Sequence, residues 1–251
     1  MKIIFLNLSG KMIAIFIIKT GGKELQRIVY IALILSLFSK INFAQTAPAL
    51  FAHPKVSAGF LLGYTDNIGG NVYGTVSDFS YDLPLSIRFS LGYTVTDAGK
   101  PLDARRIFIN DATNGTPEES GYIWEFRLDF TYPIKFFSLN KTNFLIGPRY
   151  SMFTGNFKFI GGNEFFDITA DQWGVGTGVE THLGISPSMS FVAGAGFDYY
   201  FQSKLAGHDT AYSPDGQNVN PRKDYSYKDA DDAVNQPKFE FRIMGGLNFN
   251  F

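Results

Sequence analysis

Apolar and polar residues alternate along the last part of the chain, from Phe239 to Phe251. The odd-numbered positions hold Phe, Ile, Leu or Gly, whereas the even-numbered positions hold Glu, Arg, Met, Gly or Asn. Because successive side chains of a strand point to opposite faces, this segment would present one apolar face and one polar or small face. A strand of about 10 residues with this pattern can cross a bilayer, with lipid on one side and a lumen on the other.

The same alternation occurs in seven further segments, which are separated by clusters of Gly, Pro, Asn and Asp. In the second of them, Tyr73, Phe79 and Tyr81 are expected to share a face. In the fifth, Pro148 lacks the N–H group that a barrel ladder needs, so we predict a bulge near Gly147. The seven segments are 55–64, 71–81, 85–95, 122–132, 142–160, 171–185 and 189–201, and a short loop is expected at 66–70.

Together with the last segment these make eight strands, an even number, as expected of a single-chain bacterial barrel. The connections alternate in length, and those between strands two and three, four and five, and six and seven are short. The loops at 96–120 and 202–236 are long and polar, and they would both lie at the outer end. We therefore predict an all-β fold, a transmembrane antiparallel up-and-down β-barrel of about eight strands.

Aromatic residues fall near both predicted ends of these strands, as expected for rings that favour membrane interfaces. Aromatic residues make up 16% of the chain, and its mean hydropathy is −0.01, a value that disfavours helical membrane spans but not a barrel. The predicted girdles are Tyr64, Tyr93, Trp124, Trp173, Tyr199 and Phe239 at the outer end, and Tyr81, Tyr132, Phe144 and Phe249 at the inner end.

The chain has no cysteine and a formal net charge of −1 at pH 7. It therefore has no disulfide framework, no thiolate metal site and no cysteine nucleophile. Nucleic acid is not an expected partner, because phosphate binding requires clustered lysine and arginine.

The amino-terminal segment has the layout of a secretory signal peptide. A basic stretch at 23–27 precedes an apolar run at 28–38, and Ala44 stands where a cleavage site is expected. The apolar run is short for a bilayer span. We therefore assign residues 1–44 to a signal peptide and 45–251 to the barrel. Within the former, 1–22 either precede the true start of translation or form an extended targeting region or anchor.

The predicted lumen faces carry charges of both signs in near balance, and Asp78 and Lys238 are placed among them. An eight-stranded barrel is just wide enough for its interior side chains to fill, and charges withdrawn from water need partners. We predict a salt-bridged plug, and the alternative is a narrow polar path through the same residues. The predicted network is Arg88, Glu125, Arg127, Asp129, Arg149, Glu180, His182, Asp198, Glu240 and Arg242.

Glu180 and His182 lie two residues apart on one strand and therefore share the lumen face. A carboxylate beside an imidazole could belong to a hydrolase site. The chain lacks the His-x-Ser motif of the lipid A deacylases, however, and we predict a paired lumen histidine and no enzymatic activity.

The sequences of the two long loops give weaker indications of a binding site. The acidic loop at 202–236 could bind calcium or a divalent-bridged lipopolysaccharide surface, but it fits no EF-hand spacing and is predicted to be solvated. In the loop at 96–120, the apolar residues 107–109 are expected to extend a hairpin or to contact a partner. No cofactor and no bound metal are predicted.

Residues 54–251 as a whole resemble the small eight-stranded bacterial outer-membrane barrels, the group of OmpX-like proteins and the OmpA transmembrane domain. The resemblance rests on strand rhythm, aromatic girdles, signal peptide and the terminal Phe251. It implies a place in a Gram-negative outer membrane, contact with membrane lipid and lipopolysaccharide, and recognition of Phe251 by the barrel assembly machinery.

Fold does not select among the roles of this family. The first hypothesis is surface interaction or envelope integrity through the loops at 96–120 and 202–236, without enzymatic activity. The second is a narrow porin-like channel or carrier for small solutes. A lipid-modifying enzyme and an accessory subunit of a secretion or motility complex are the remaining two.

Overall fold

The structure is a computed structural model, and it describes residues 2–8, 11–17, 54–79, 84–112, 114–136 and 139–251. It divides into two compact units, Met1–Pro48 and Ala49–Phe251, which are described separately. In the first unit, β1 (Lys2–Leu8) pairs antiparallel with β2 (Lys11–Ile17). The core of the predicted signal peptide, 23–44, lies outside the described residues and stays a prediction. No described helix is long and apolar enough to cross a bilayer.

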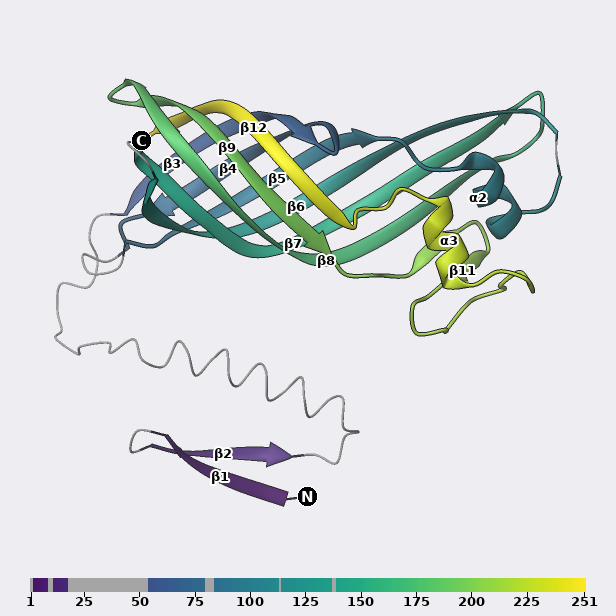
Figure 1. Cartoon of the computed structure of the whole chain (residues 1–251), viewed down its shortest axis with the longest axis horizontal. Helices are drawn as coiled ribbons and strands as arrows, with labels where there is room; N and C mark the ends of the chain where they lie inside the picture. The colour runs from purple at the N-terminus through teal and green to yellow at the C-terminus, as the bar shows by residue number, and fades with distance from the viewer. Residues whose placement is uncertain (1, 9–10, 18–53, 80–83, 113, 137–138) are drawn as a thin grey trace. The chain divides into compact units, whose positions relative to one another are not determined.

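The second unit contains a closed barrel (Figure 1). Its strands are β3 (Lys55–Thr65), β4 (Asn67–Ser77), β5 (Ser86–Thr96), β6 (Thr116–Phe136), β7 (Leu139–Ile160), β8 (Phe165–Ser186), β9 (Met189–Tyr200) and β12 (Phe239–Asn250). Neighbouring strands are antiparallel and follow chain order, and β12 closes the wall by pairing with both β9 and β3. The predicted eight-stranded up-and-down barrel is therefore confirmed for the described part of the chain.

The alternation of side chains places charge inside and apolar groups outside. In β5, Arg88 is 4% exposed, whereas the next residue, Phe89, is 66% exposed. In β8, every second residue from Phe166 to Gly176 is buried. An exposed apolar wall around a buried polar interior is the arrangement of a barrel that faces lipid.

The predicted face of Tyr73 is the main error in the strand assignments. A tight turn at Asp66, whose φ is 50°, starts β4 at Asn67, so residues 67–70 belong to a strand and not to the predicted loop. The resulting register points Tyr73 into the lumen, where it is 4% exposed and donates a hydrogen bond to Asn248. Tyr81, predicted to share its face, lies outside the described residues.

The predicted bulge near Gly147 is also wrong. The pairs Arg127–Arg149 and Phe130–Ile146 keep one register, and the register shift in this part of the barrel lies between Ile134 and Phe136 instead. Pro148 is exposed on the outer wall, and the ladder between β6 and β7 omits the two residue pairs around it. The missing N–H is therefore accommodated by a local interruption of the ladder rather than by an extra residue.

The seam between β12 and β3 requires glycine at position 246, since a Cβ atom there would lie 1.9 Å from the carbonyl oxygen of Phe60. We expect Gly246→Ala to destabilise the folded barrel by about 1–3 kcal/mol, because the paired backbones must move apart. Urea unfolding in lipid vesicles measures this change. Gly74→Ala is the matched control, since a Cβ at Gly74 meets no described atom within 4 Å. Equal losses in both variants would contradict the prediction.

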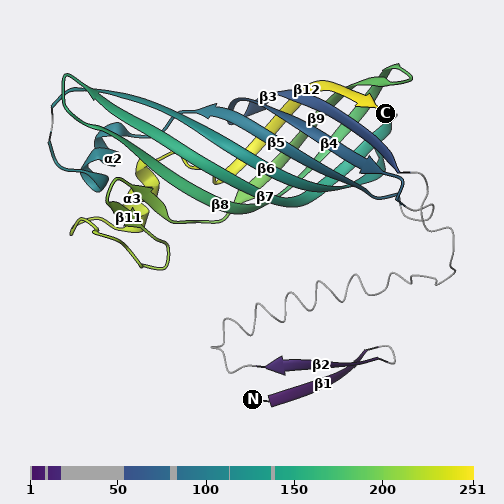
Figure 2. The same ribbon diagram turned by 180° about the vertical axis from the view of Figure 1, so that it is seen from behind.

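One end of the barrel carries a small folded cap. It consists of α2 (Pro101–Phe108), β10 (Leu205–Gly207), β11 (Thr210–Tyr212) and α3 (Tyr227–Ala233), with their connecting residues (Figure 2). The strands β6, β7 and β8 have 21, 22 and 22 residues, about twice the length that a bilayer requires, and β10 pairs with the extended part of β8. The loops at 96–120 and 202–236, both predicted to be polar and the second to be solvated, are therefore largely structured.

The cap has a hydrophobic core of its own, built against the inner faces of the extended strands. Ile107 and Phe108, predicted to extend a hairpin or to meet a partner, are buried within it. The core also includes inward-facing aromatic residues of β7 and β8 and residues of the segment 202–236. Its buried members include Ile123, Phe153, Phe157, Phe159, Phe166, Ile168, Leu205, Tyr212, Ala230 and Val234.

Candidate functional site: the lumen and the cap

Asp198 of β9 is the centre of the lumen network. It is fully buried, and its carboxylate lies 2.8 Å from Arg149 of β7, 2.5 Å from Arg242 of β12 and 3.5 Å from Arg127 of β6. Glycine is required opposite this group, because a Cβ at Gly176 would lie 1.8 Å from Asp198 Oδ1. The small residue in β8 therefore creates the space in which strands from across the barrel share one carboxylate.

Two further ion pairs attach to this centre. Arg149 also binds Asp129 at 2.7 Å, and Arg127 also binds Glu125 at 2.7 Å. Tyr200 donates a hydrogen bond of 2.5 Å to the other oxygen of Glu125. Charge-assisted contacts of this kind hold a buried network in one arrangement, so the middle of the lumen is filled by paired side chains.

A second layer lies on the side away from the cap. Arg88 makes two contacts with Glu180, donates to Thr75 at 3.0 Å, and places its guanidinium 4.1 Å from the centre of the Tyr73 ring. His182 lies 2.9 Å from Glu180 through Nε2 and 3.3 Å from Ser190 through Nδ1. His182 is thus the paired lumen histidine expected of its position.

The spaces between these groups are small. A void of about 40 Å³ separates the Arg88 layer from the Asp198 layer, enough for about one water molecule. Larger hollows lie at the ends: about 290 Å³ beneath the cap, bordered by Asp66, Asp97 and Glu240, and about 330 Å³ at the opposite end, bordered by His182 and Ser190. We call these the cap-side hollow and the far-side hollow. Between these two hollows, the described lumen contains the ion pairs of the Arg88 layer and the Asp198 layer.

Specific polar contacts hold the cap over the mouth of the lumen. Gln172 of β8 donates to the carbonyl oxygen of Pro237 at 2.9 Å, and Lys238 binds Asp231 of α3 at 2.9 Å. Lys100 N–H donates to Ala233 O at 2.8 Å and so joins the helices α2 and α3. These contacts connect the cap to the barrel rim at several points.

A buried arginine joins α2 to the connection between β7 and β8. Arg105 is 1% exposed, forms an ion pair with Glu164, and lies with its guanidinium 4.3 Å from the centre of the Phe159 ring. Partial burial opposes ionisation of Glu164, but hydrogen bonds from Asn110 and Arg105 and the Arg105 charge outweigh it and hold the carboxyl pKa below its usual 4.5. The carboxylate form is therefore favoured when the cap is docked.

This depressed pKa makes cap docking sensitive to acid. A group whose folded pKa is lowered contributes stability that is present above its unfolded pKa, here about 4.5, and that is lost as the pH falls through the folded value. We expect near-ultraviolet circular dichroism of the cap tyrosines to weaken in this acid range, with a smaller acid-dependent change in Glu164→Gln. Identical pH profiles for the two proteins would contradict this.

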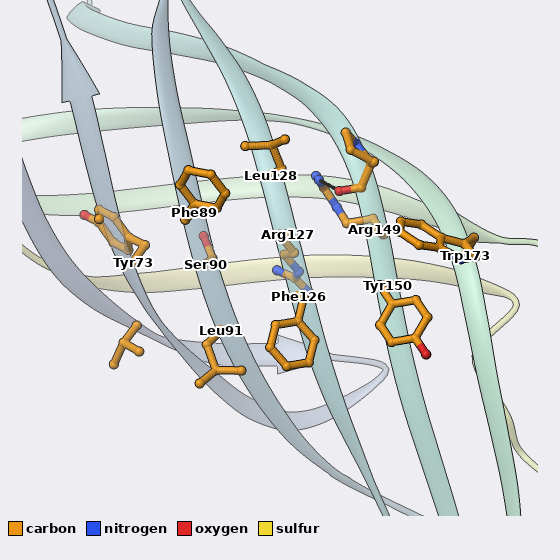
Figure 3. A pocket seen from close by; sticks show the side chains of 13 residues that line it. Tyr73, Phe89, Ser90, Leu91, Phe126, Arg127, Leu128, Arg149, Tyr150 and Trp173 are labelled. Carbon is orange, nitrogen blue, oxygen red and sulfur yellow. Dashed lines mark hydrogen bonds between the residues drawn. The ribbon is translucent and has the colours of Figure 1, made fainter.

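The predicted girdle residues lie on the outer wall where they are described. Apart from Phe144, which is partly buried, they are exposed to between 36% for Phe249 and 63% for Trp173, and the rings of Tyr93 and Trp124 lie 4.9 Å apart. An apolar hollow of about 840 Å³ lies on this wall. Figure 3 shows side chains that line it, among them Phe89, Phe126 and Trp173. The exposed girdle residues include Tyr64, Tyr93, Trp124, Tyr132, Trp173, Tyr199 and Phe249.

Sequence reasoning missed two features of this region. It did not find that Glu240 lacks an ion-pair partner among the described residues, and it did not find that Ser190 contacts His182, because both depend on which strands become neighbours. It also placed Asp78 in the lumen set, whereas Asp78 follows the end of β4 and binds Lys55 at 2.9 Å.

Comparison with solved structures agrees with this architecture. A crystal structure of a major outer membrane protein from Thermus thermophilus matches with a TM-score of 0.65 and 24% identity, over 80% of this chain and 100% of that chain. Ail of Yersinia pestis, solved with the heparin analogue sucrose octasulfate, matches at 0.40 and 11% identity, over 79% and 97%. The outer membrane protease OmpT of Escherichia coli matches at 0.36 and 9% identity, over 82% and 99%.

The Thermus structure and this chain share one fold. No family model and no curated protein sequence matches the chain. The chain has the fold of an eight-stranded antiparallel outer-membrane β-barrel.

Proposed function

We propose that this protein is a non-enzymatic integral barrel of the bacterial outer membrane, with a sealed lumen, that acts at the cell surface through its cap. The observation that carries the proposal is the Asp198 network, in which three arginines from three strands fill the lumen beneath the folded cap. A lumen blocked in this way favours a role in surface interaction or envelope integrity over transport.

Membrane insertion is supported by the exposed apolar wall. Its partners would be outer-membrane lipid and lipopolysaccharide, and Phe251, 82% exposed, would be the signal for the barrel assembly machinery. The cap, which contains most of 96–120 and 202–236, would then face outward and meet any surface ligand. Retention of the protein in the outer-membrane fraction, and its loss from that fraction on deletion of Phe251, would support these assignments.

If the barrel is inserted in a membrane, a charged substitution on its outer wall should reduce stability by an amount that depends on its position along the strand. Leu91 is 38% exposed near the middle of β5, and we expect Leu91→Arg to destabilise the inserted barrel by about 2–4 kcal/mol, because an arginine there meets hydrocarbon. Unfolding in vesicles measures the change. Leu102→Arg is the control, since Leu102 is 48% exposed on α2 of the cap. A soluble protein would tolerate both changes equally.

A sealed lumen is tested by single-channel recording on the full refolded chain in a planar bilayer. We expect no steady conductance. The double variant Arg88→Ala with Glu180→Ala removes one layer without changing the net charge, and it should admit more leak than the wild type. Steady wild-type conductance that is lost on replacement of Arg127 or Glu125 would instead favour the porin-like channel.

One observation favours a second candidate function. His182 joins Ser190 and Glu180 at 3.3 and 2.9 Å, the order of contacts in a Ser–His–acid triad, and it borders the far-side hollow. One contact argues against a hydrolase: both carboxylate oxygens of Glu180 accept hydrogen bonds from Arg88. A fluorophosphonate probe distinguishes a hydrolase from a non-enzymatic barrel. In a hydrolase, the Ser190 hydroxyl would attack the phosphorus atom, its proton would pass to His182, and fluoride would leave, so that the protein becomes labelled. The non-enzymatic proposal expects no label, and label lost in Ser190→Ala would overturn it.

Assembly with a secretion or motility complex would also use the cap. Pull-down with the intact cap, and with the cap variant discussed below, separates this role from independent action at the surface. A stable stoichiometric partner recovered only with the intact cap would favour the accessory role.

A further inference from the structure

Glu240 is an acidic side chain that the lumen network leaves without a partner. It lies near the start of β12 and is 3% exposed, and its Oε2 atom makes no hydrogen bond or ion pair with any described residue. It faces Asp198 directly across the β12–β9 pairing, and one carboxylate oxygen from each of Glu240, Asp198 and Glu125 lies within 4.8 Å of the others. Like charges directly opposite one another on paired strands are destabilising.

The local charges do not balance. Arg88 and Glu180 cancel in their own layer. Among the described residues of the Asp198 layer, three arginines face four carboxylates, which leaves one negative charge in excess. The arginines are Arg127, Arg149 and Arg242, and the carboxylates are Glu125, Asp129, Asp198 and Glu240. An unpaired buried charge is strongly destabilising, so the excess charge needs compensation.

We propose that Glu240, together with Glu125 and Asp198, forms a binding site for a single positive charge, a proton or one alkali-metal ion. One such charge neutralises the layer. A divalent ion would leave an excess positive charge close to Arg127 and Arg242, whose guanidinium groups already lie 3.5 and 2.5 Å from Asp198. The arginines therefore select for a ligand of unit charge.

The site has an access route. Glu240 borders the cap-side hollow of about 290 Å³, whose lining also includes Asp66, Asp97 and Lys238. Lys238 is paired with Asp231, so the unpaired charges on this hollow are mostly negative and would attract cations. The charge that reaches Glu240 would therefore come from the solvent beneath the cap.

The charged and titratable groups around Glu240 determine whether it takes up a positive charge. From β9 these are Asp198 and Tyr200, and from β6 they are Glu125 and Arg127. Asp66 in the turn between β3 and β4 also faces it, as does Arg242 on β12 itself. Acidic neighbours outnumber basic ones, which favours the uptake of positive charge by the group that has no arginine of its own.

The test uses the full refolded chain in lipid vesicles, with Glu240→Gln as the variant and Glu118→Gln as its control. Glu118 is exposed on the extended part of β6. Infrared spectroscopy at neutral pH detects the carbonyl stretch of a protonated carboxylic acid. Urea unfolding in sodium, potassium or choline chloride at equal ionic strength detects a bound alkali-metal ion.

A protonated-acid band that disappears in Glu240→Gln and persists in Glu118→Gln assigns a proton. Without that band, a wild-type unfolding midpoint that shifts to higher urea in sodium or potassium than in choline, a shift lost in Glu240→Gln, assigns an alkali-metal ion. If neither signal is found, the proposal is overturned. It is also overturned if calcium chloride, but neither sodium nor potassium chloride, raises the unfolding midpoint and Glu240→Gln abolishes that shift.

Discussion

Replacing Asp198 with asparagine is expected to destabilise the folded barrel by about 3–5 kcal/mol, the usual cost of removing one partner from a buried ion-pair network. Asp198 is fully buried, and its carboxylate contacts three arginines from three different strands. The amide retains the shape but not the charge, so Arg149 and Arg242 each lose their Asp198 partner in a medium where unpaired charges are costly. Urea unfolding in vesicles, followed by tryptophan fluorescence, measures the loss.

The matched control is Asp209→Asn. Asp209 also pairs with a basic group, His208 at 3.2 Å, but the two side chains are 67% and 66% exposed, and the pair lies in the turn between β10 and β11. Exposed pairs contribute little, so the unfolding midpoint should stay unchanged. If Asp198→Asn unfolds at the same urea concentration as the wild type, the network fills space without holding the strands together.

Period-two patterning was sufficient to predict the barrel and the inward charges. The pattern is local, because the same backbone geometry that turns Arg88 into the lumen turns Phe89 to the outer wall. The pattern failed at Tyr73, because the face of that residue is set by how β4 pairs with β3 after the tight turn at Asp66.

The partners within the lumen could not be predicted in the same way. Arg149 and Asp198 lie 49 residues apart and belong to strands that are not adjacent, so their contact depends on how the wall curves and closes. The lack of an ion-pair partner for Glu240 among the described side chains has the same origin. Charge balance along the sequence indicated a paired interior, but it did not indicate which acid would be left over.

The cap was missed for a different reason. Its polar composition indicated a solvated loop, and its apolar residues are few in each segment. Ile107 and Tyr212 lie 105 residues apart, yet the Tyr212 hydroxyl donates to the Ile107 carbonyl at 3.1 Å. Two sparse segments share one core here, and neither has a recognisable core by itself.

A large loss of stability is also expected when a residue of this shared core is truncated. Phe108 is fully buried, its ring meets that of Tyr212 edge-on at 5.4 Å, and it packs beneath Gly207 of β10. We expect Phe108→Ala to cost about 3–5 kcal/mol, the usual cost of removing a buried phenylalanine ring. Because this core lies among the cap and the cap-side ends of β6, β7 and β8, separate from the lumen network, this loss should open the cap locally while the barrel stays closed.

Hydrogen-exchange mass spectrometry separates these two outcomes within one experiment. Amides of β10, β11 and α3 should lose protection in Phe108→Ala, while those of β3 to β5 keep it. Leu102→Ala provides the control, since Leu102 belongs to the same helix but is 48% exposed. Loss of protection throughout the barrel would mean that cap and wall unfold as one unit. Unchanged protection of the cap would mean that Phe108 does not hold it in place, and that the contacts of Arg105 and Lys100 are sufficient.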